Sequence, residues 1–338
     1  MARYSKGEAR SWAREHLKGV SNVIHPSFSA NLKSLNEQGI RHDVRLDETL
    51  GFTGALLISE VAISIPEYRQ FFQIARDESS KNFHLVHHAS WNTFEDNIEA
   101  VRIAEEEGAD VVLLSYPSNF WPKGPEDIYD YTKRYCDATS LGVMLFPLPF
   151  WGFDRLHPSD IQADIIRRLI DDCPNIVAIK AEGAMPGIMG FVECYRKFNE
   201  DVVVTYPLES EFAALAQFMP MQYSGTSNTE YFGATFPKVF ELLRDGNFDE
   251  ATRIYWQLHP ARKAAQANSA YLPHTLFIHR MMWKYMGWLQ GFNGGPSRAP
   301  TMRLNQRQLT DLRQGLIRSG LEPTVDADAA FFEGRFPC

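Results

Sequence analysis

Lys180 is the residue of this chain whose type and position best suit covalent chemistry. It ends the apolar run Ile176-Val177-Ala178-Ile179 and precedes the short segment Ala181-Glu182-Gly183-Ala184. Burial disfavours the charged form of a lysine and therefore lowers its pKa. The free amine produced in this way can attack a carbonyl carbon and form an imine. A surface lysine at a strand–loop junction is the ordinary alternative. The surrounding elements show which of these two interpretations, a buried reactive lysine or an exposed one, is favoured.

Polar and aromatic residues also end the other apolar runs of the chain. They are His25, Ser59 with Glu60, His87 with His88, Tyr116, Phe146, Tyr206, and Ser224 with Gly225. Imine chemistry needs proton donors and acceptors near the amine for its carbinolamine and enamine steps, and this set contains them. A purely structural hydrogen-bond role is the alternative for any one of these residues.

The three histidines His84, His87 and His88 are close enough in sequence to suggest metal ligands. Adjacent residues of a strand point to opposite faces, so at most one of His87 and His88 can face a shared pocket. We therefore expect no metal site here. The chain also lacks a P-loop, a G-x-S-x-G motif and an H-E-x-x-H motif.

Short apolar, β-branched runs alternate with helical segments over the first two thirds of the chain. The expected strands are Asn22–His25, Gly54–Ile58, His84–His88, Val111–Tyr116, Gly142–Pro147, Ile176–Lys180, Val202–Tyr206 and Met221–Gly225. The expected helices are Pro66–Ser79, Thr93–Glu107, Pro125–Thr139, Pro158–Asp171, Gly187–Phe198 and Glu209–Phe218. Successive strand–helix units whose strands are buried on both faces predict an α/β protein with a (β/α)8 TIM barrel. An open doubly wound sheet is the alternative, but no glycine-rich dinucleotide fingerprint follows any strand.

Four regions are expected along the chain. A helical segment over 1–18 precedes the barrel at 19–235, and a C-terminal helical extension occupies 236–325. The helices of this extension are Phe236–Arg244, Phe248–Gln266, Pro273–Trp288 and Gln306–Ser319. Residues 326–338 should form a loosely ordered terminal tail.

Composition narrows the classes of partner. The 338 residues carry a net charge of −8, which argues against nucleic acid. No window approaches 18 uninterrupted apolar residues, and the N-terminus lacks the apolar stretch of a secretion signal. The four cysteines show no CxxC spacing. These features predict a cytoplasmic protein that binds neither nucleic acid nor membranes.

Several short motifs occur in an order and spacing that is specific to one superfamily. They are Asn92-Thr93-Phe94-Glu95, Gly108-Ala109-Asp110, Pro117 with Pro122, Asn175-Ile176-Val177-Ala178-Ile179-Lys180, Thr226-Ser227-Asn228, and Gly294-Gly295-Pro296-Ser297-Arg298-Ala299-Pro300. Through them the chain resembles the dihydrodipicolinate synthase / N-acetylneuraminate lyase superfamily of class I aldolases and related lyases, roughly from Gly19 to Pro323. The resemblance implies a homotetramer of (β/α)8 barrels whose lysine forms a Schiff base with a 2-oxo acid, most often pyruvate. Lys180 falls on that position, and no cofactor is implied because the imine itself is the electron sink.

The departures from this pattern concern the groups around the lysine. The family's Gly-Thr-Thr-Gly-Glu loop, whose hydroxyls hold the substrate carboxylate, is shortened here, and Ser59 is the hydroxyl that is left. Phe146 takes the place of the proton-shuttling tyrosine, and Asn119 that of a second tyrosine borrowed from a neighbouring subunit. Synthesis of dihydrodipicolinate is therefore not expected, since phenylalanine cannot relay a proton. Tyr116, Tyr206 or a histidine would have to replace the phenol.

The sequence thus predicts a Schiff-base-dependent lyase of the aldolase or hydratase-aldolase type that acts on a 2-oxo acid. Lys180, Tyr116 and Tyr206 are the expected catalytic residues. The expected substrate-binding residues are Ser59, Phe146, His88, Gly225 and Asn119. Aromatic residues in the loops after the third to fifth strands favour an aromatic-bearing substrate, unless they pack under the C-terminal helices or at a subunit interface; they are Trp91, Phe120, Trp121, Phe150, Trp151 and Phe153.

Three alternatives stay open. The first is a sugar-acid dehydratase of the same superfamily, which would use the same imine. The second is a non-catalytic ligand-binding member that has lost the tyrosine relay. The third is a lyase or hydrolase that uses His87 or His88 as general base without an imine.

Overall fold

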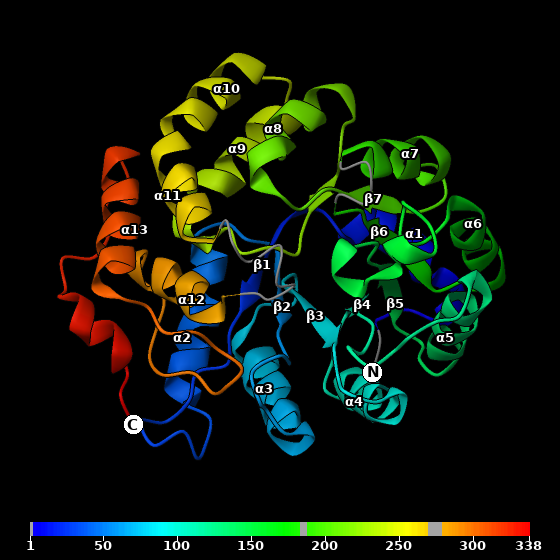
Figure 1. Cartoon of the computed structure of the whole chain (residues 1–338), viewed down its shortest axis with the longest axis horizontal. Coiled ribbons are helices and arrows are strands. Elements are labelled where there is room, and N and C mark those ends of the chain that lie inside the picture. The colour runs from blue at the N-terminus through cyan, green and yellow to red at the C-terminus, as the bar shows by residue number, and fades with distance from the viewer. Residues whose placement is uncertain (1–2, 183–187, 270–278) are drawn as a thin grey trace.

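The computed structural model describes residues 3–182, 188–269 and 279–338, and eight parallel strands form its centre (Figure 1). The strands are β1 (Gly19–Ile24), β2 (Gly54–Leu57), β3 (His84–Ala89), β4 (Val111–Leu114), β5 (Gly142–Leu145), β6 (Ile176–Lys180), β7 (Val203–Thr205) and β8 (Tyr223–Ser224). They pair in the order β7-β6-β5-β4-β3-β2-β1-β8. Every strand residue is buried, as expected for strands covered on both faces.

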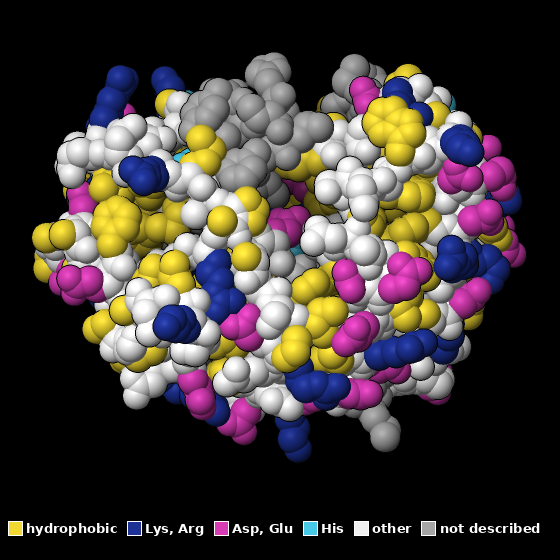
Figure 2. Space-filling model, turned by 60° about the horizontal axis from the view of Figure 1, so that its bottom comes forward, with side chains coloured by type: hydrophobic (Ala, Val, Ile, Leu, Met, Phe, Trp, Pro, Cys, Tyr) yellow, Lys and Arg dark blue, Asp and Glu magenta, His cyan; other side chains and the backbone are white. Residues whose placement is uncertain are grey.

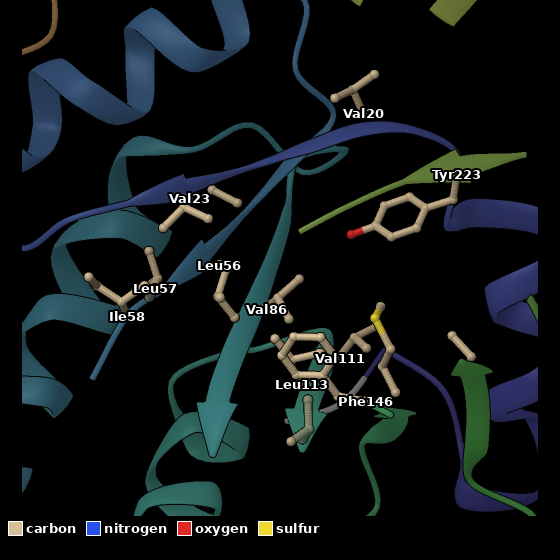
Figure 3. Packing of buried hydrophobic residues seen from close by; sticks show 14 of the residues in the cluster. Val20, Val23, Leu56, Leu57, Ile58, Val86, Val111, Leu113, Phe146 and Tyr223 are labelled. Atoms are coloured by element: carbon tan, nitrogen blue, oxygen red, sulfur yellow. The ribbon is translucent and has the colours of Figure 1, made fainter. Parts of the chain in front are cut away.

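The two strands at the ends of this order, β7 and β8, lie beside each other. The hydroxyl of Thr205 in β7 donates a hydrogen bond of 2.8 Å to the carbonyl of Tyr223 in β8. The sheet is therefore nearly closed, and the predicted (β/α)8 barrel is confirmed. Figure 3 shows the apolar side chains that fill the space between the strands, with the Tyr223 ring reaching in from β8.

Helices follow the strands around the barrel. They are α2 (Glu37–Thr49), α3 (Ile65–Glu78), α4 (Phe94–Glu106), α5 (Pro125–Asp137), α6 (Ala163–Asp172), α7 (Ile188–Phe198) and α8 (Glu209–Phe218). Helix α2 was not among the helices predicted from the sequence. Its buried face carries Asp43 and Asp47 beside Ile40 and Val44, so the apolar periodicity of an amphipathic helix is interrupted.

The C-terminal extension contains α9 (Thr235–Arg244), α10 (Phe248–Gln257), α11 (His259–Ser269), α12 (Arg280–Leu289) and α13 (Gln306–Arg318). The single helix expected over Phe248–Gln266 is two helices, which meet at Leu258 just before Pro260. Proline at the first turn favours a new helix start, because it lacks the N–H that a continuing helix needs. The expected starts at Gly187 and Pro273 lie outside the described residues. No described helix is both long and apolar enough to cross a membrane.

The last residues are packed against α12, so the expectation of a loosely ordered tail is wrong. Phe331 is fully buried and its ring lies 5.2 Å from that of Tyr285. The Arg335 side chain donates hydrogen bonds of 3.0 Å to the carbonyls of Phe292 and Trp288. This apolar anchor and these carbonyl contacts fix the tail, although its composition is that of a terminus.

The helix α1 (Ala9–His16) covers the amino-terminal end of the barrel. The ring of Trp12 packs against those of Tyr4 and His84, at centroid distances of 4.5 and 5.5 Å. Arg10 donates to the Ile176 carbonyl at 2.9 Å. A ligand therefore has to approach from the carboxyl ends of the strands, where barrels of this type carry their active sites.

Candidate active site

Lys180 is the last residue of β6 and is only 5% exposed. Its Nζ donates a hydrogen bond of 2.6 Å to the Thr226 carbonyl, in the segment that follows β8. The ring centroid of Phe146 lies 4.0 Å from Nζ, and Oε2 of Glu182 lies 3.4 Å away. The amine therefore faces a phenyl ring, a backbone carbonyl and a carboxylate at the open end of the barrel.

The surroundings of Lys180 favour its free-amine form. Burial lowers the pKa of Lys180, and the negative charge of Glu182 opposes this effect only in part. The positive charge of Arg280 lowers the pKa further. A neutral amine is the nucleophile that imine formation requires.

Glu60 and Arg280 form an ion pair at the same end of the barrel. Nη2 of Arg280 donates to Oε2 of Glu60, and the Ser90 hydroxyl donates to the other carboxylate oxygen at 3.0 Å. Burial alone would raise the pKa of Glu60, but Arg280 and His88 lower it to about 2. Glu60 is therefore a carboxylate at neutral pH.

His88 faces the barrel interior, and at most one member of the histidine pair was expected to do so. Its Nε2 lies 3.2 Å from the Ser115 hydroxyl and 3.8 Å from Oε1 of Glu60. Burial lowers the pKa of His88 to about 4, against the opposing charge of Glu60, so the imidazole is neutral at pH 7. His87 points the other way, with Nδ1 3.1 Å from the hydroxyl of Tyr68 on α3.

A second polar chain reaches the open end from β1. His25 follows β1, and its Nε2 lies 3.2 Å from Nδ2 of Asn228. The same amide nitrogen donates to Oε1 of Glu230 at 3.1 Å. Burial raises the pKa of Glu230 to about 8, so this carboxyl holds its proton at neutral pH.

The two tyrosines proposed as proton donors differ in where their hydroxyls lie. The Tyr116 hydroxyl is 2.7 Å from that of Thr132 on α5, which places it in the outer helix layer. No described residue hydrogen-bonds the Tyr206 hydroxyl, on which the charges of Glu211 and Glu182 act, and the Tyr206 ring lies 5.2 Å from that of Phe191 on α7. Burial raises the pKa of both phenols, so both stay protonated. Of the two phenols, Tyr206 is the one whose hydroxyl no described residue engages.

The remaining predicted binding residues occupy different surroundings. The Ser59 hydroxyl donates to the His88 carbonyl at 3.1 Å, so its proton is already engaged. A Cβ at Gly225 would lie 2.7 Å from Ser21 Cβ and from the Tyr223 hydroxyl, which explains the glycine. Asn119 lies exposed in a turn between β4 and α5.

The loop aromatics mostly pack against one another. Tyr116 contacts Phe120 and Phe153 at centroid distances of 5.7 and 5.0 Å. The Trp151 indole donates to the Phe146 carbonyl at 2.7 Å, whereas Trp121 is 72% exposed. Trp151 also lies 5.7 Å from the Phe146 ring, and the expectation that these residues line an apolar mouth stays a prediction. Figure 2 shows a recess in which acidic and histidine side chains are visible.

Arg280, Glu182 and Ser115 belong to the site but were not predicted from the sequence. Glu182 was named only as part of the short segment after the lysine, and its position two residues from Lys180 was the available signal. Arg280 is separated from Glu60 by 220 residues, so no local pattern indicates their contact.

The barrel and its buried lysine at the end of β6 are the features of class I lyases that form Schiff bases. Residues 58–316 match the model of the dihydrodipicolinate synthetase family, and the chain belongs to this family.

Named relatives have several activities. A 4-hydroxy-tetrahydrodipicolinate synthase of Methanopyrus kandleri is 21% identical over 91% of this chain and 98% of its own length. A probable 5-dehydro-4-deoxyglucarate dehydratase of Chelativorans sp. is 25% identical over 74% of this chain and 81% of its own. An N-acetylneuraminate lyase of Pasteurella multocida is 24% identical over 76% and 86%.

Solved structures agree on the fold. Dihydrodipicolinate synthase from Aquifex aeolicus superposes with a TM-score of 0.76 at 15% identity, covering 91% of this chain and 99% of that one. N-acetylneuraminate lyase from Fusobacterium nucleatum gives 0.73 at 18% identity, covering 90% and 99%.

Proposed function

We propose that this protein is a lyase in which Lys180 forms a Schiff base with the keto carbon of a 2-oxo acid. The observation that carries the proposal is the buried Lys180 amine, 3.4 Å from the Glu182 carboxylate at the open end of the barrel. Family membership supports it, because the family includes lyases, synthases and dehydratases.

Glu182 is suited to the proton transfers for which the family tyrosine is missing. The amine lone pair attacks the keto carbon, and the carbonyl π electrons move to oxygen. Glu182 accepts one proton from the nitrogen and passes it to this oxygen, which gives the neutral carbinolamine. A second proton, supplied by solvent, is added to the hydroxyl, and water leaves as the nitrogen lone pair forms the C=N bond. The iminium cation that results lies against the face of Phe146, where a cation–π contact stabilises positive charge.

The iminium withdraws electrons from the neighbouring carbon, so that a proton or a carbon group can leave and an enamine forms. Tyr206, whose hydroxyl has no hydrogen-bond partner among the described residues, is the phenol that would exchange a proton in this step, and the charges of Glu211 and Glu182 both act on it.

The polar surroundings of Lys180 favour the sugar-acid dehydratase over an aromatic-bearing substrate. Glu60, His88, Ser115, Glu182 and Arg280 offer charged and hydrogen-bonding groups to hydroxyls, whereas most loop aromatics are occupied by one another. Five relatives named probable 5-dehydro-4-deoxyglucarate dehydratase, at 25–28% identity, support the same choice.

Reductive trapping tests the Schiff base. The protein is incubated with pyruvate and borohydride, and its intact mass is measured before and after proteolysis. We expect one reduced pyruvate adduct per chain, located on Lys180 and absent from Lys180→Ala. Lys284 is a matched internal control, because it is also buried and its pKa is lowered to about 8. An adduct on Lys284, or equal labelling of the Lys180→Ala variant, would overturn the assignment, and no adduct at all would favour the non-catalytic or histidine-based alternatives.

We also propose a homotetramer in the cytoplasm. The superfamily resemblance supports the tetramer, and exposed apolar residues such as Phe218 and Trp256 offer contact surface. The described cysteines are unpaired, as expected in a reducing compartment. Light scattering coupled to size-exclusion chromatography measures the mass in solution, and a monomer at micromolar concentration would contradict the tetramer.

A further inference from the structure

The Arg280 side chain joins the C-terminal extension to the open end of the barrel. It begins α12, is 7% exposed at its side chain, and pairs with Glu60 in the segment after β2. Glu60 in turn lies 3.8 Å from His88 and accepts a hydrogen bond from Ser90. The guanidinium is therefore fixed at the barrel end that carries Lys180.

The positive charge of Arg280 acts on groups from four sides of the opening. It lowers the pKa of Lys180 in β6, His88 in β3, His25 after β1 and Glu230 after β8. Among the cations that act on Lys180, Arg280 has the largest effect. The charge of Arg280 therefore acts on groups at four strand ends around this opening.

Arg280 also has hydrogen-bond donors to spare. A guanidinium carries five N–H groups, and Glu60 is its one hydrogen-bond partner within the described residues. The alternative donor near Glu60 is Ser59, but its hydroxyl proton is bonded to the His88 carbonyl. The Lys180 amine is needed as the nucleophile. Arg280 therefore offers a fixed positive charge, with N–H groups that no described residue other than Glu60 occupies, at the barrel end that carries Lys180.

We propose that Arg280 binds the carboxylate attached to the keto carbon of the substrate, and that Glu60 positions its guanidinium. This inference rests on the proposed Schiff base, because the carboxylate of a 2-oxo acid is one bond from the carbon that Lys180 attacks. Charge-assisted hydrogen bonds from a fixed guanidinium are well suited to a carboxylate. The C-terminal extension thereby contributes a specificity-determining residue to the barrel.

The test compares trapping of pyruvate with trapping of its neutral amide, pyruvamide, by borohydride. For Arg280→Gln, we expect the half-saturating pyruvate concentration to rise about 10- to 100-fold, as for loss of a hydrogen bond to a charged group. Trapping of pyruvamide should change by less than about 3-fold, because the amide carries no charge for Arg280 to bind. Arg280→Lys keeps the positive charge but loses the planar guanidinium. Its half-saturating pyruvate concentration should therefore lie between those of the wild type and Arg280→Gln.

Arg262→Gln is the matched control. Arg262 forms a comparable buried pair with Glu209, their side chains being 4% and 7% exposed, but on α11 and α8. The ratio of the half-saturating concentrations for trapping of pyruvate and of pyruvamide should be the same in Arg262→Gln as in the wild type. Since Arg280→Gln leaves Glu60 unpaired, the double variant Glu60→Gln/Arg280→Gln provides a neutral pair and should show the same selective loss of pyruvate trapping.

The outcomes separate this inference from the proposed function. Trapping of neither compound by the wild-type protein would overturn the Schiff base, and the Arg280 role with it. Normal wild-type trapping with an unchanged pyruvate-to-pyruvamide ratio in the Arg280→Gln and double variants would overturn the Arg280 role alone. A selective loss of pyruvate trapping in Arg262→Gln as well would also overturn it, because the effect would then be one of general stability.

Discussion

Replacing Glu182 by glutamine separates two effects that this carboxylate has on Lys180. Glutamine keeps the size and polarity of the side chain but cannot accept and return a proton. Positioned general acid–base groups contribute typically about 10²- to 10⁴-fold to a rate. We therefore expect the rate of imine formation in Glu182→Gln to fall at least about 100-fold, equivalent to about 2.7 kcal/mol of activation free energy.

The same substitution makes the amine easier to deprotonate. Burial lowers the pKa of Lys180, and the charge of Glu182, 3.4 Å from Nζ, partly offsets that lowering. Without this charge, the pKa of Lys180 falls further, and the free amine persists to lower pH. The acid limb of the pH–rate profile should therefore move to lower pH while the plateau drops.

The assay is the rate of pyruvate trapping by borohydride, measured across the pH range for the wild type and the variant. Glu211→Gln serves as a control, because Glu211 acts on Tyr206 but is not among the main groups that shift Lys180. A plateau that stays at the wild-type level would refute the proton-relay role of Glu182. An acid limb that moves to higher pH would refute the electrostatic account of Lys180.

Three further substitutions test other parts of the site and its support. Tyr116→Phe should leave the trapping rate unchanged and lower the free energy of unfolding by about 0.5–1.5 kcal/mol in a urea titration, since its hydroxyl bonds to Thr132. Burial raises the pKa of Glu230 to about 8, so this carboxyl destabilises the fold increasingly as the pH rises above its pKa in the unfolded chain. Glu230→Gln should therefore raise the Tm at about pH 8 and change it little near pH 4. A larger rise in Tm near pH 4 than at pH 8 would contradict this. Gly225→Ala should destabilise the fold by about 1–3 kcal/mol, because its Cβ would lie 2.7 Å from two side chains, whereas Gly7→Ala, which has open space, should be close to neutral in the same titration.

The barrel itself could be predicted because its strands are buried on both faces. Such strands read as continuous apolar runs, and the run at Ile176–Lys180 coincides with β6. Helix α2 could not be predicted in the same way. Asp43 and Asp47 occupy its inner face, and burial of these carboxylates is made possible by partners from distant segments, such as Asn22 in β1 and the Asn293 backbone.

Within the site, Lys180, Phe146 and His88 could be predicted from their places at strand ends, whereas Arg280, Glu182 and Ser115 could not. A residue at a strand end can point to the opening or to the outer helices, and Tyr116 does the latter. Arg280 comes from a helix of the C-terminal extension, so its place beside Glu60 depends on tertiary packing. For Glu182, the short distance in sequence from Lys180 was the available signal.

The unequal closure of the barrel affects how readily the backbone amide hydrogens of its strands exchange with solvent. β7 and β8 are tied by the Thr205 hydroxyl rather than by the backbone ladder that joins the other neighbours, and the Lys180 amine reaches across β7 to the Thr226 carbonyl. Local opening should therefore be easiest along this junction. Imine formation at Lys180 alters its hydrogen bond to the Thr226 carbonyl, which is one of the contacts at this junction. Amide hydrogen exchange in β7 and β8 should therefore change when substrate is bound to the lysine, and exchange in the other strands should not.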